Sequence, residues 1–222
     1  MGEFHISIGG SLLWTGLYFV FMLFYTLMDI AVWRKLFPKH SGAANLFTVA
    51  FCICGFLLLL RKTGYQLSVF SHFTPPHFLL SVCCSILLFI FFDRGLDRVF
   101  DVLFPQSEKN YREAIRQLTN STVTSFIQIC LFAPFIEEIL MREFLLQGLT
   151  PRYGAAAALL LSSVLFAVLH FNMVQSLSAL FCGIILGLLY LATGSVLCCI
   201  LAHSGYNLLS YITAIRSASS EG

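Results

Sequence analysis

Residues 51–60 read FCICGFLLLL and residues 155–169 read AAAALLLSSVLFAVL, and stretches of this kind decide the fold class. Neither stretch alternates between apolar and polar residues, as the strands of a membrane β-barrel would. A helix that crosses a bilayer needs about 20 mainly apolar residues. The apolar stretches therefore predict transmembrane helices.

The composition of the whole chain excludes the common soluble classes. Of its 222 residues, 58% are hydrophobic and 11% are charged, against about 25% charged in an average soluble domain. Mean hydropathy is +0.85. So much apolar surface cannot be hidden in one core, and it excludes intrinsic disorder as well. A net charge of +2 makes no case for nucleic-acid binding.

We therefore predict an all-α polytopic transmembrane helix bundle with about seven spans. The third span is short and begins at Pro75-Pro76, so the count depends on it. The predicted spans are residues 11–33, 44–60, 76–92, 121–148, 154–171, 174–193 and 195–213. With seven spans, nine basic residues fall on one side and three on the other. The positive-inside rule then places the N-terminus outside and the C-terminus inside.

Three regions follow from this pattern. Residues 1–120 hold the N-terminal spans and an amphipathic segment, residues 121–213 hold the functional helices, and residues 214–222 form a polar tail. Within 93–120, one helical face is apolar and another carries aspartates, which predicts a helix at the membrane interface or a solvated linker. The eight cysteines lie in apolar runs without CxxC spacing, and we interpret them as small lipid-facing or core residues.

Several ionisable side chains lie inside predicted spans, where each costs at least about 2.5–3.5 kcal/mol on insertion scales. Such groups usually mark function. The fourth span carries four of them, the fifth ends with a histidine, and the seventh holds a histidine and an asparagine. These residues are Glu137, Glu138, Arg142, Glu143, His170, His203 and Asn207.

Helical spacing relates these side chains to one another. Glu138 and Arg142 are four residues apart, so they share a face and can form a local ion pair. Glu137 points about 100° away and stays free. His170 and His203 lie on other helices, and the rise per residue puts the three sites within a depth spread of about 10 Å, which helix tilt can absorb. One site built by the last four helices is therefore possible.

Three motifs now stand in order: Glu137-Glu138-x-x-x-Arg142, Phe166-x-x-x-His170 and His203-x-x-x-Asn207. Together with Pro134 before the glutamate pair, they resemble the CPBP family of intramembrane glutamic endopeptidases. That family includes the type II CAAX prenyl endopeptidases and is also called the Abi family. The resemblance covers about residues 130–210. One departure is Glu143, where many members have glycine.

The resemblance implies a membrane-embedded endopeptidase that works without a cofactor. Glu137 would act as general base on a water, and His170 would hold that water or help to activate it. His203 and Asn207 would donate hydrogen bonds to the oxyanion. Glu138, Arg142 and Phe166 would support these groups. The implied substrate is a membrane-associated peptide or protein, either lipidated or plain, such as a CAAX-type tail or a bacteriocin- or pheromone-like peptide.

Other interpretations stay open. The charged cluster could be a buried polar lock, and His203 with Asn207 could be interhelical glue. Two histidines and two glutamates could bind zinc, although an HExxH motif is absent. The chain could also be an inactive membrane scaffold, a regulator or an immunity protein, or a small proton-coupled transporter. Its small size and short loops favour the bacterial plasma membrane.

Overall fold

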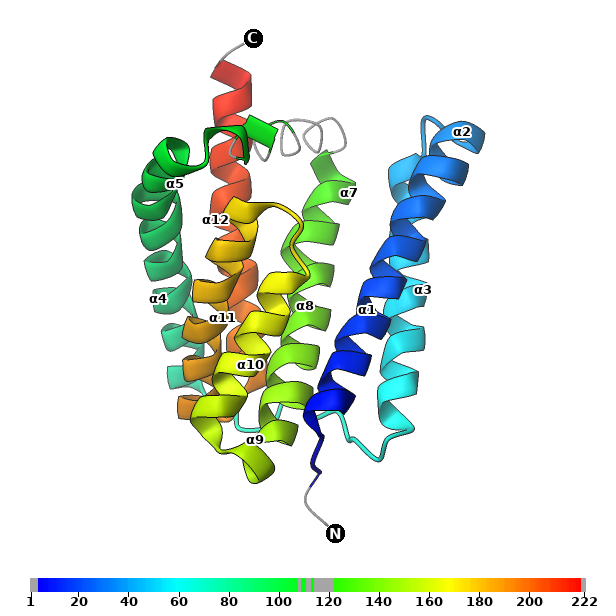
Figure 1. The fold of residues 1–222 in the computed structure, drawn as a ribbon. Coiled ribbons are helices and arrows are strands. Elements are labelled where there is room, and N and C mark those ends of the chain that lie inside the picture. The colour runs from blue at the N-terminus through cyan, green and yellow to red at the C-terminus, as the bar shows by residue number, and fades with distance from the viewer. Residues whose placement is uncertain (1–3, 108, 111–112, 114–121, 221–222) are drawn as a thin grey trace.

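The computed structural model of the chain describes residues 4–107, 109–110, 113 and 122–220, and all regular elements in this part are helices (Figure 1). The all-α prediction is therefore confirmed. The longer helices are α1 (Ile8–Met28), α3 (Ser41–Arg61), α4 (Pro75–Phe91), α10 (Ala155–Val168), α11 (Met173–Thr193) and α12 (Val196–Ser220).

Shorter segments extend these helices or join them. After α1 come η1 (Asp29–Trp33) and α2 (Arg34–Leu36), and after α4 come η2 (Phe92–Leu96) and α5 (Asp97–Leu103). One long helix is built from α7 (Thr122–Ile127), η4 (Gln128–Phe132), α8 (Ala133–Glu138), η5 (Ile139–Leu146) and α9 (Gln147–Tyr153). The segments labelled η are π-helical, a form that often occurs at functional sites.

Six helices of the described residues are long and apolar enough to cross a membrane. They agree with six of the seven predicted spans. The seventh apolar segment, α10, is shorter than the predicted 154–171 and has 14 residues. Gly154, with φ +78°, separates α10 from α9. α10 ends at Val168, and a short turn leads to Asn172, whose side chain caps the start of α11.

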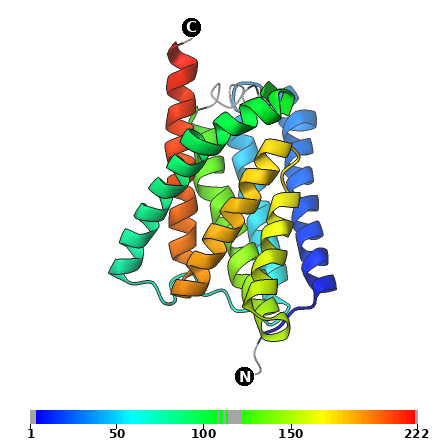
Figure 2. The same ribbon diagram turned by 60° about the vertical axis from the view of Figure 1, so that its left-hand side comes forward.

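The seven apolar segments run alternately between two ends of the molecule (Figures 1 and 2). The N-terminus, the α3–α4 connection and α9 lie at one end. α2, α5 and the C-terminal end of α12 lie at the other. The described segments α2, η2–α5 and the C-terminal part of α12 carry part of the larger basic set, and they lie at the same end. Which end faces the cytoplasm stays a prediction.

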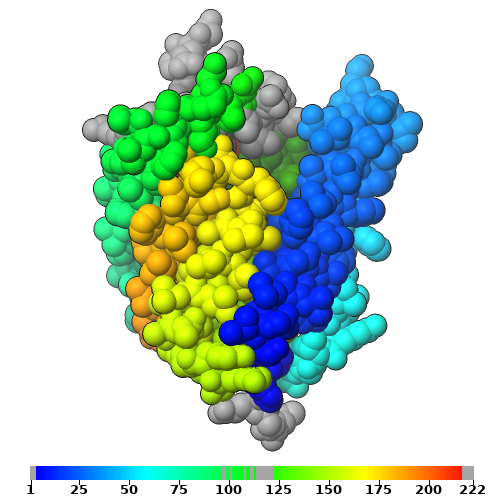
Figure 3. All heavy atoms as spheres, viewed as in Figure 1, coloured from blue at the N-terminus to red at the C-terminus, as the bar shows by residue number. Residues whose placement is uncertain are grey.

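The hairpin of α1 and α3 stands beside a bundle formed by the other helices (Figure 1). Its base is attached firmly: the Ile6 amide donates to the Gly148 carbonyl at 2.8 Å, and the Phe4 and Trp14 rings pack on Phe144. Further along α1, α7 is visible at the back of a recess between α1 and the end of α10 (Figure 3). The hairpin meets the bundle again towards that end, where Phe19 packs on Phe171 and the start of α3 at Gly42 lies against Thr124 of α7.

Small residues hold the bundle helices close together. Ser81 and Ser85 of α4 donate to the carbonyl oxygens of Cys198 and Ala202 on α12, at 3.0 and 2.9 Å. On α11, a Cβ added at Gly183 would lie 3.0 Å from the Cβ of Ser163 on α10. These contacts set the position of α12, which carries His203 and Asn207.

The predicted amphipathic segment is described only in part, because residues 108, 111–112 and 114–121 of it lie outside the described residues. Within α5, Phe100 is buried whereas Val102 is exposed. The following turn is tied to the bundle, since Ser107 and Asn172 exchange two hydrogen bonds of 2.7 and 2.8 Å. The last helix continues through the predicted polar tail to Ser220.

Candidate functional site

The helix that carries the glutamate pair lies deep in the bundle. Glu138 ends α8 and Arg142 lies in the π-helical η5, whose eight residues are all buried. The Arg142 Nε donates to Glu138 Oε2 at 2.8 Å, and both side chains are 0% exposed. The ion pair expected from the four-residue spacing is therefore present. Arg142 Nη1 and Nη2 have no hydrogen-bond partner among the described residues.

His203 joins this pair from α12. Its Nδ1 lies 2.9 Å from Glu138 Oε1, so one carboxylate bridges a guanidinium and an imidazole that come from two helices. Because Glu138 accepts through both oxygens, it is held in a single orientation. The Nε2 of His203 is not used in this contact. It can donate only if the ring carries protons on both nitrogens, and Glu138 would offset that positive charge.

Phe166 lies at the centre of the polar cluster. Its ring centre is 5.4 Å from Arg142 Cζ, 5.1 Å from the ring of His170 and 6.0 Å from the ring of His203. Phe166 is itself buried. Its ring lies between the Glu138–Arg142 pair and His170, and it also contacts His203. All three motifs therefore contact this one ring.

His170 follows the end of α10. Its Nδ1 donates to the Phe166 carbonyl at 3.0 Å, which leaves Nε2 of the neutral ring as an acceptor. The His170 carbonyl accepts a short hydrogen bond from Ser176. Both ends of this residue are thus fixed, with one ring nitrogen available to a water or substrate.

Asn207 lies one turn beyond His203 on α12. Its amide nitrogen donates to the carbonyl oxygen of Ile129 at 2.9 Å. Ile129 belongs to η4, where the π-helical backbone alters the regular pattern of α-helical hydrogen bonds. An amide nitrogen has two protons, so one remains for another acceptor.

Glu137 differs from its neighbour Glu138. It is partly exposed, and no hydrogen bond or ion pair joins it to any residue that the structure describes. Its neighbour Ile136 lines a pocket that Tyr18 and Tyr25 of α1 also line. The structure thus brings together Glu138, Arg142, Phe166, His170 and His203. It leaves the Glu137 carboxylate free and engages Asn207 with backbone.

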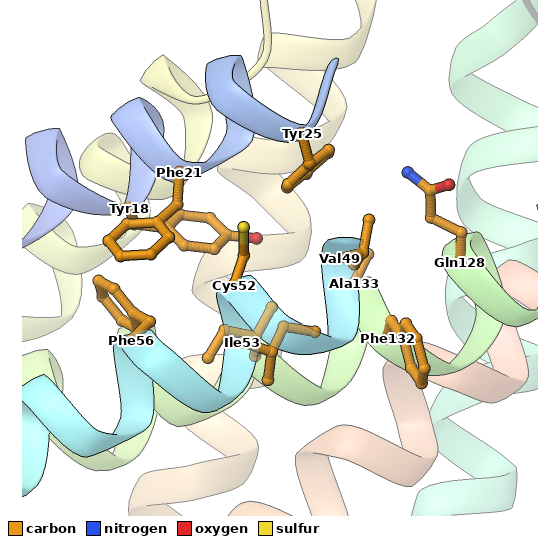
Figure 4. A pocket seen from close by; sticks show the side chains of 11 residues that line it. Tyr18, Phe21, Tyr25, Val49, Cys52, Ile53, Phe56, Gln128, Phe132 and Ala133 are labelled. Carbon is orange, nitrogen blue, oxygen red and sulfur yellow. The ribbon is translucent and has the colours of Figure 1, made fainter. Parts of the chain in front are cut away.

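A pocket lies next to Glu137, between the hairpin and the site helix (Figure 4). Its volume is about 40 Å³, roughly enough for a few waters or a small side chain. Ile136, the residue before Glu137, lines it from α8. Most of the wall is aromatic or aliphatic, and the polar groups come from Tyr18, Tyr25 and Gln128. Sequence motifs could not identify the two tyrosines, because both lie in an otherwise apolar span and belong to none of the three motifs.

Glu143, the departure from the family pattern, does not contact Arg142. Its Oε1 accepts from the Ser68 amide at 2.9 Å, in the connection between α3 and α4. Tyr65 is buried nearby, and burial together with the charge of Glu143 raises the pKa of its phenol. Glu143 therefore holds this connection against the site helix and takes no part in the Glu138 cluster.

No group of three or more His, Cys, Asp or Glu side chains in the described part of the chain has the arrangement of a metal site. Glu138, the carboxylate nearest to a site histidine, already contacts Arg142 and His203 through its two oxygens. Of the donors considered for zinc, Glu138 and His203 contact each other, but no third one completes such a group among the described residues.

The fold and these buried charges define a polytopic helical membrane protein with a polar cluster inside the bundle. Residues 119–209 match the family model described as Rce1-like, the type II CAAX prenyl endopeptidase Rce1-like family. This segment includes all three motifs, and the match confirms the resemblance to the CAAX-type membrane endopeptidases. No curated protein and no solved structure matches the chain.

Proposed function

We propose that the protein hydrolyses a peptide bond of a membrane-associated substrate with a water activated by Glu137. The observation that carries this proposal is the contrast between two adjacent glutamates. Glu138 is fully buried and its oxygens are occupied by Arg142 and His203, whereas Glu137 is partly exposed beside a pocket. A general base must be accessible and unpaired, and Glu137 is both.

In the proposed reaction, Glu137 takes a proton from a water, and the water oxygen forms a bond to the carbonyl carbon of the substrate. The His170 Nε2 accepts a hydrogen bond from that water, because its Nδ1 is used by the Phe166 carbonyl. The C–N bond then breaks. Glu137 passes its proton to the nitrogen of the leaving amine as the carbonyl re-forms, so a carboxylic acid and an amine are the products.

The negative charge that forms on the carbonyl oxygen needs hydrogen-bond donors close to that oxygen. His203 supplies Nε2–H in the form of the ring that carries protons on both nitrogens, since its Nδ1 faces Glu138. Asn207 supplies the amide proton that Ile129 does not use. Arg142 and Glu138 hold His203 in place. The reaction requires no cofactor.

The substrate class follows from the surroundings of the site. It lies among helices that could cross a bilayer, so a peptide must reach it within or beside the membrane. A lipidated CAAX-type tail and a bacteriocin- or pheromone-like peptide both meet this condition. The short connections of the chain favour a peptide-processing role in a bacterial plasma membrane.

The test uses purified protein in liposomes with a library of farnesylated and plain peptides, and mass spectrometry of the products. Wild type is compared with Glu137→Gln, each with and without a strong chelator. We expect cleavage in the wild type, no effect of the chelator, and a loss of at least about 100-fold in turnover for Glu137→Gln.

Glu143→Gln is the matched control, because it neutralises another glutamate of the same helix and keeps an acceptor for Ser68. Its turnover should stay within about twofold of wild type. Undiminished cleavage by Glu137→Gln would contradict the assigned base. Cleavage abolished by the chelator would instead favour zinc chemistry, and no cleavage at all would favour a membrane scaffold.

A further inference from the structure

The family match begins at residue 119, so it assigns nothing to the α1–α3 hairpin. Yet this hairpin forms one wall of the pocket beside Glu137, with side chains from both α1 and α3. The opposite wall comes from η4 and α8 (Figure 4). One wall of the pocket therefore belongs to the hairpin and the other to the bundle.

Two tyrosines of α1 place hydroxyl groups by this pocket. Tyr18 and Tyr25 are seven residues apart, so they lie on one face of the helix, two turns from each other. The Tyr18 ring is fixed, with only 5% of the residue exposed and its centre 5.6 Å from that of Phe56. Tyr25 is partly exposed. Among the described residues, no hydrogen bond joins either hydroxyl to a partner, and both side chains line the pocket.

Ile136, the neighbour of Glu137, lines the opposite wall of the same pocket. Gln128, on the opposite wall, adds an amide to the same pocket. A buried tyrosine normally finds a partner for its hydroxyl. Two tyrosines with unused hydroxyls in an apolar pocket, next to a free carboxylate, therefore indicate that a polar chain binds between them.

We propose that Tyr18 and Tyr25 bind the main chain of the substrate peptide and position it beside Glu137. This inference rests on the proposed peptidase function. The occupant is an extended peptide that passes the mouth of the pocket, and one of its carbonyl or amide groups enters to hydrogen-bond to the hydroxyls and Gln128. The volume of about 40 Å³ leaves room for no more than such a group or one small side chain. The hairpin is then part of the substrate site, and the matched segment alone is incomplete.

The kinetic test removes the hydroxyls and keeps the rings. Tyr18→Phe, Tyr25→Phe and the double variant are compared with wild type on the peptide that is cleaved fastest in the library. We expect KM to rise about three- to tenfold for each hydroxyl, with kcat unchanged, because these hydrogen bonds stabilise bound substrate and transition state equally. A merely structural role would lower the amount of folded enzyme and leave KM unaltered.

Tyr190→Phe is the matched control, since its hydroxyl contacts Gln147, outside the pocket. It should leave KM unchanged. An unchanged KM in the double variant would overturn the inference even if Glu137→Gln is inactive. KM of the double tyrosine variant thus tests the hairpin proposal, and the activity of Glu137→Gln tests the assigned base.

A binding test needs no turnover. In the Glu137→Gln protein, p-benzoylphenylalanine replaces Phe21, which lines the pocket, or Phe47, which lies on α3 and is 80% exposed. After irradiation with the same peptide library, we expect peptide adducts at position 21 and none at position 47. Adducts at 21 should weaken in the Tyr18→Phe/Tyr25→Phe background. Their absence at position 21 would overturn the proposal whether or not the library is cleaved.

Discussion

The hairpin of α1 and α3 and the bundle that carries the motifs are both apolar, but they bury their residues very differently. In the most apolar window of Ile8–Leu36, 11% of residues are buried, against 44% in Val123–Tyr153. The η5 part of the site helix is buried on all sides, whereas α1 exposes most of its surface as a lipid-facing helix would. Polar groups inside the bundle therefore need partners from the protein.

The bundle meets this need with a network across helices, and the hairpin does not. Glu138 connects α8, η5 and α12 through Arg142 and His203. The tyrosines of α1 keep free hydroxyls in a pocket. The comparison suggests a division of roles in which the bundle holds a rigid chemical centre and the hairpin presents an adaptable wall.

Removing the central cation should have the largest effect on stability. Arg142→Ala leaves Glu138 as a buried carboxylate with His203 as its remaining partner. Breaking a buried pair in this way costs about 3–5 kcal/mol. We expect a large fall in the unfolding midpoint in detergent and loss of cleavage.

Arg152→Ala is the control for that measurement. This arginine is exposed at the end of α9 and stacks on Tyr153 at 5.5 Å. Its loss should change stability by about 1 kcal/mol or less. An Arg142→Ala protein as stable as the Arg152→Ala protein would mean that the polar network does not hold the bundle together.

The ion pair at the centre of that test could be predicted from sequence because it is local. Four residues on one helix bring Glu138 to Arg142, whatever the other helices do. The contact of His203 with Glu138 could not be predicted, because it depends on the depth and rotation of α12 relative to α8. Rise per residue alone left a spread of about 10 Å in depth among the sites.

In the fold, too, local features could be predicted from the sequence, whereas features that depend on neighbouring segments could not. Apolar runs were enough to locate the helices, since length and composition decide whether a segment can cross a bilayer. The short α10 and the π-helical segments were not predicted. The end of α10 depends on the turn before Asn172, and a π-helix differs from an α-helix in hydrogen bonding and not in composition. The pocket tyrosines were missed because their role depends on a neighbouring helix.

Glycine substitutions test the difference in packing between the two regions. In α11, an added Cβ at Gly183 would lie 3.0 Å from Cβ and 3.1 Å from Cα of Ser163. The backbone of α10 cannot rotate away, so Gly183→Ala should destabilise the protein by about 1–3 kcal/mol. Gly16 of α1 has nothing within 4 Å of its added Cβ.

Gly16→Ala should therefore be neutral or raise stability by up to about 1 kcal/mol, because alanine favours the helix. Unfolding midpoints of the two variants in the same detergent give the comparison. Similar losses of stability in both variants would show that α1 packs as tightly against a neighbour as α11 does.

The smallest expected difference concerns the first turns of two helices. Asn172 caps α11: its side chain accepts from the amides of Val174 and Gln175, and it also exchanges hydrogen bonds with Ser107. Ser7 caps α1 through a single bond from the Gly10 amide at 3.1 Å. Loss of such a cap costs about 0.5–2 kcal/mol. We expect the loss of stability to be near the upper end of this range for Asn172→Ala and near its lower end for Ser7→Ala.

The two caps also differ in what they position, and this gives a second measurement. The turn before Asn172 contains His170, so Asn172→Ala should lower kcat by loosening that residue. Ser7 lies at the attached base of the hairpin, where the Ile6 amide still bonds to Gly148. Ser7→Ala should therefore leave both kcat and KM within about twofold. A fall in kcat for Ser7→Ala equal to that for Asn172→Ala would mean that the start of α1 is coupled to the chemistry as closely as the bundle is.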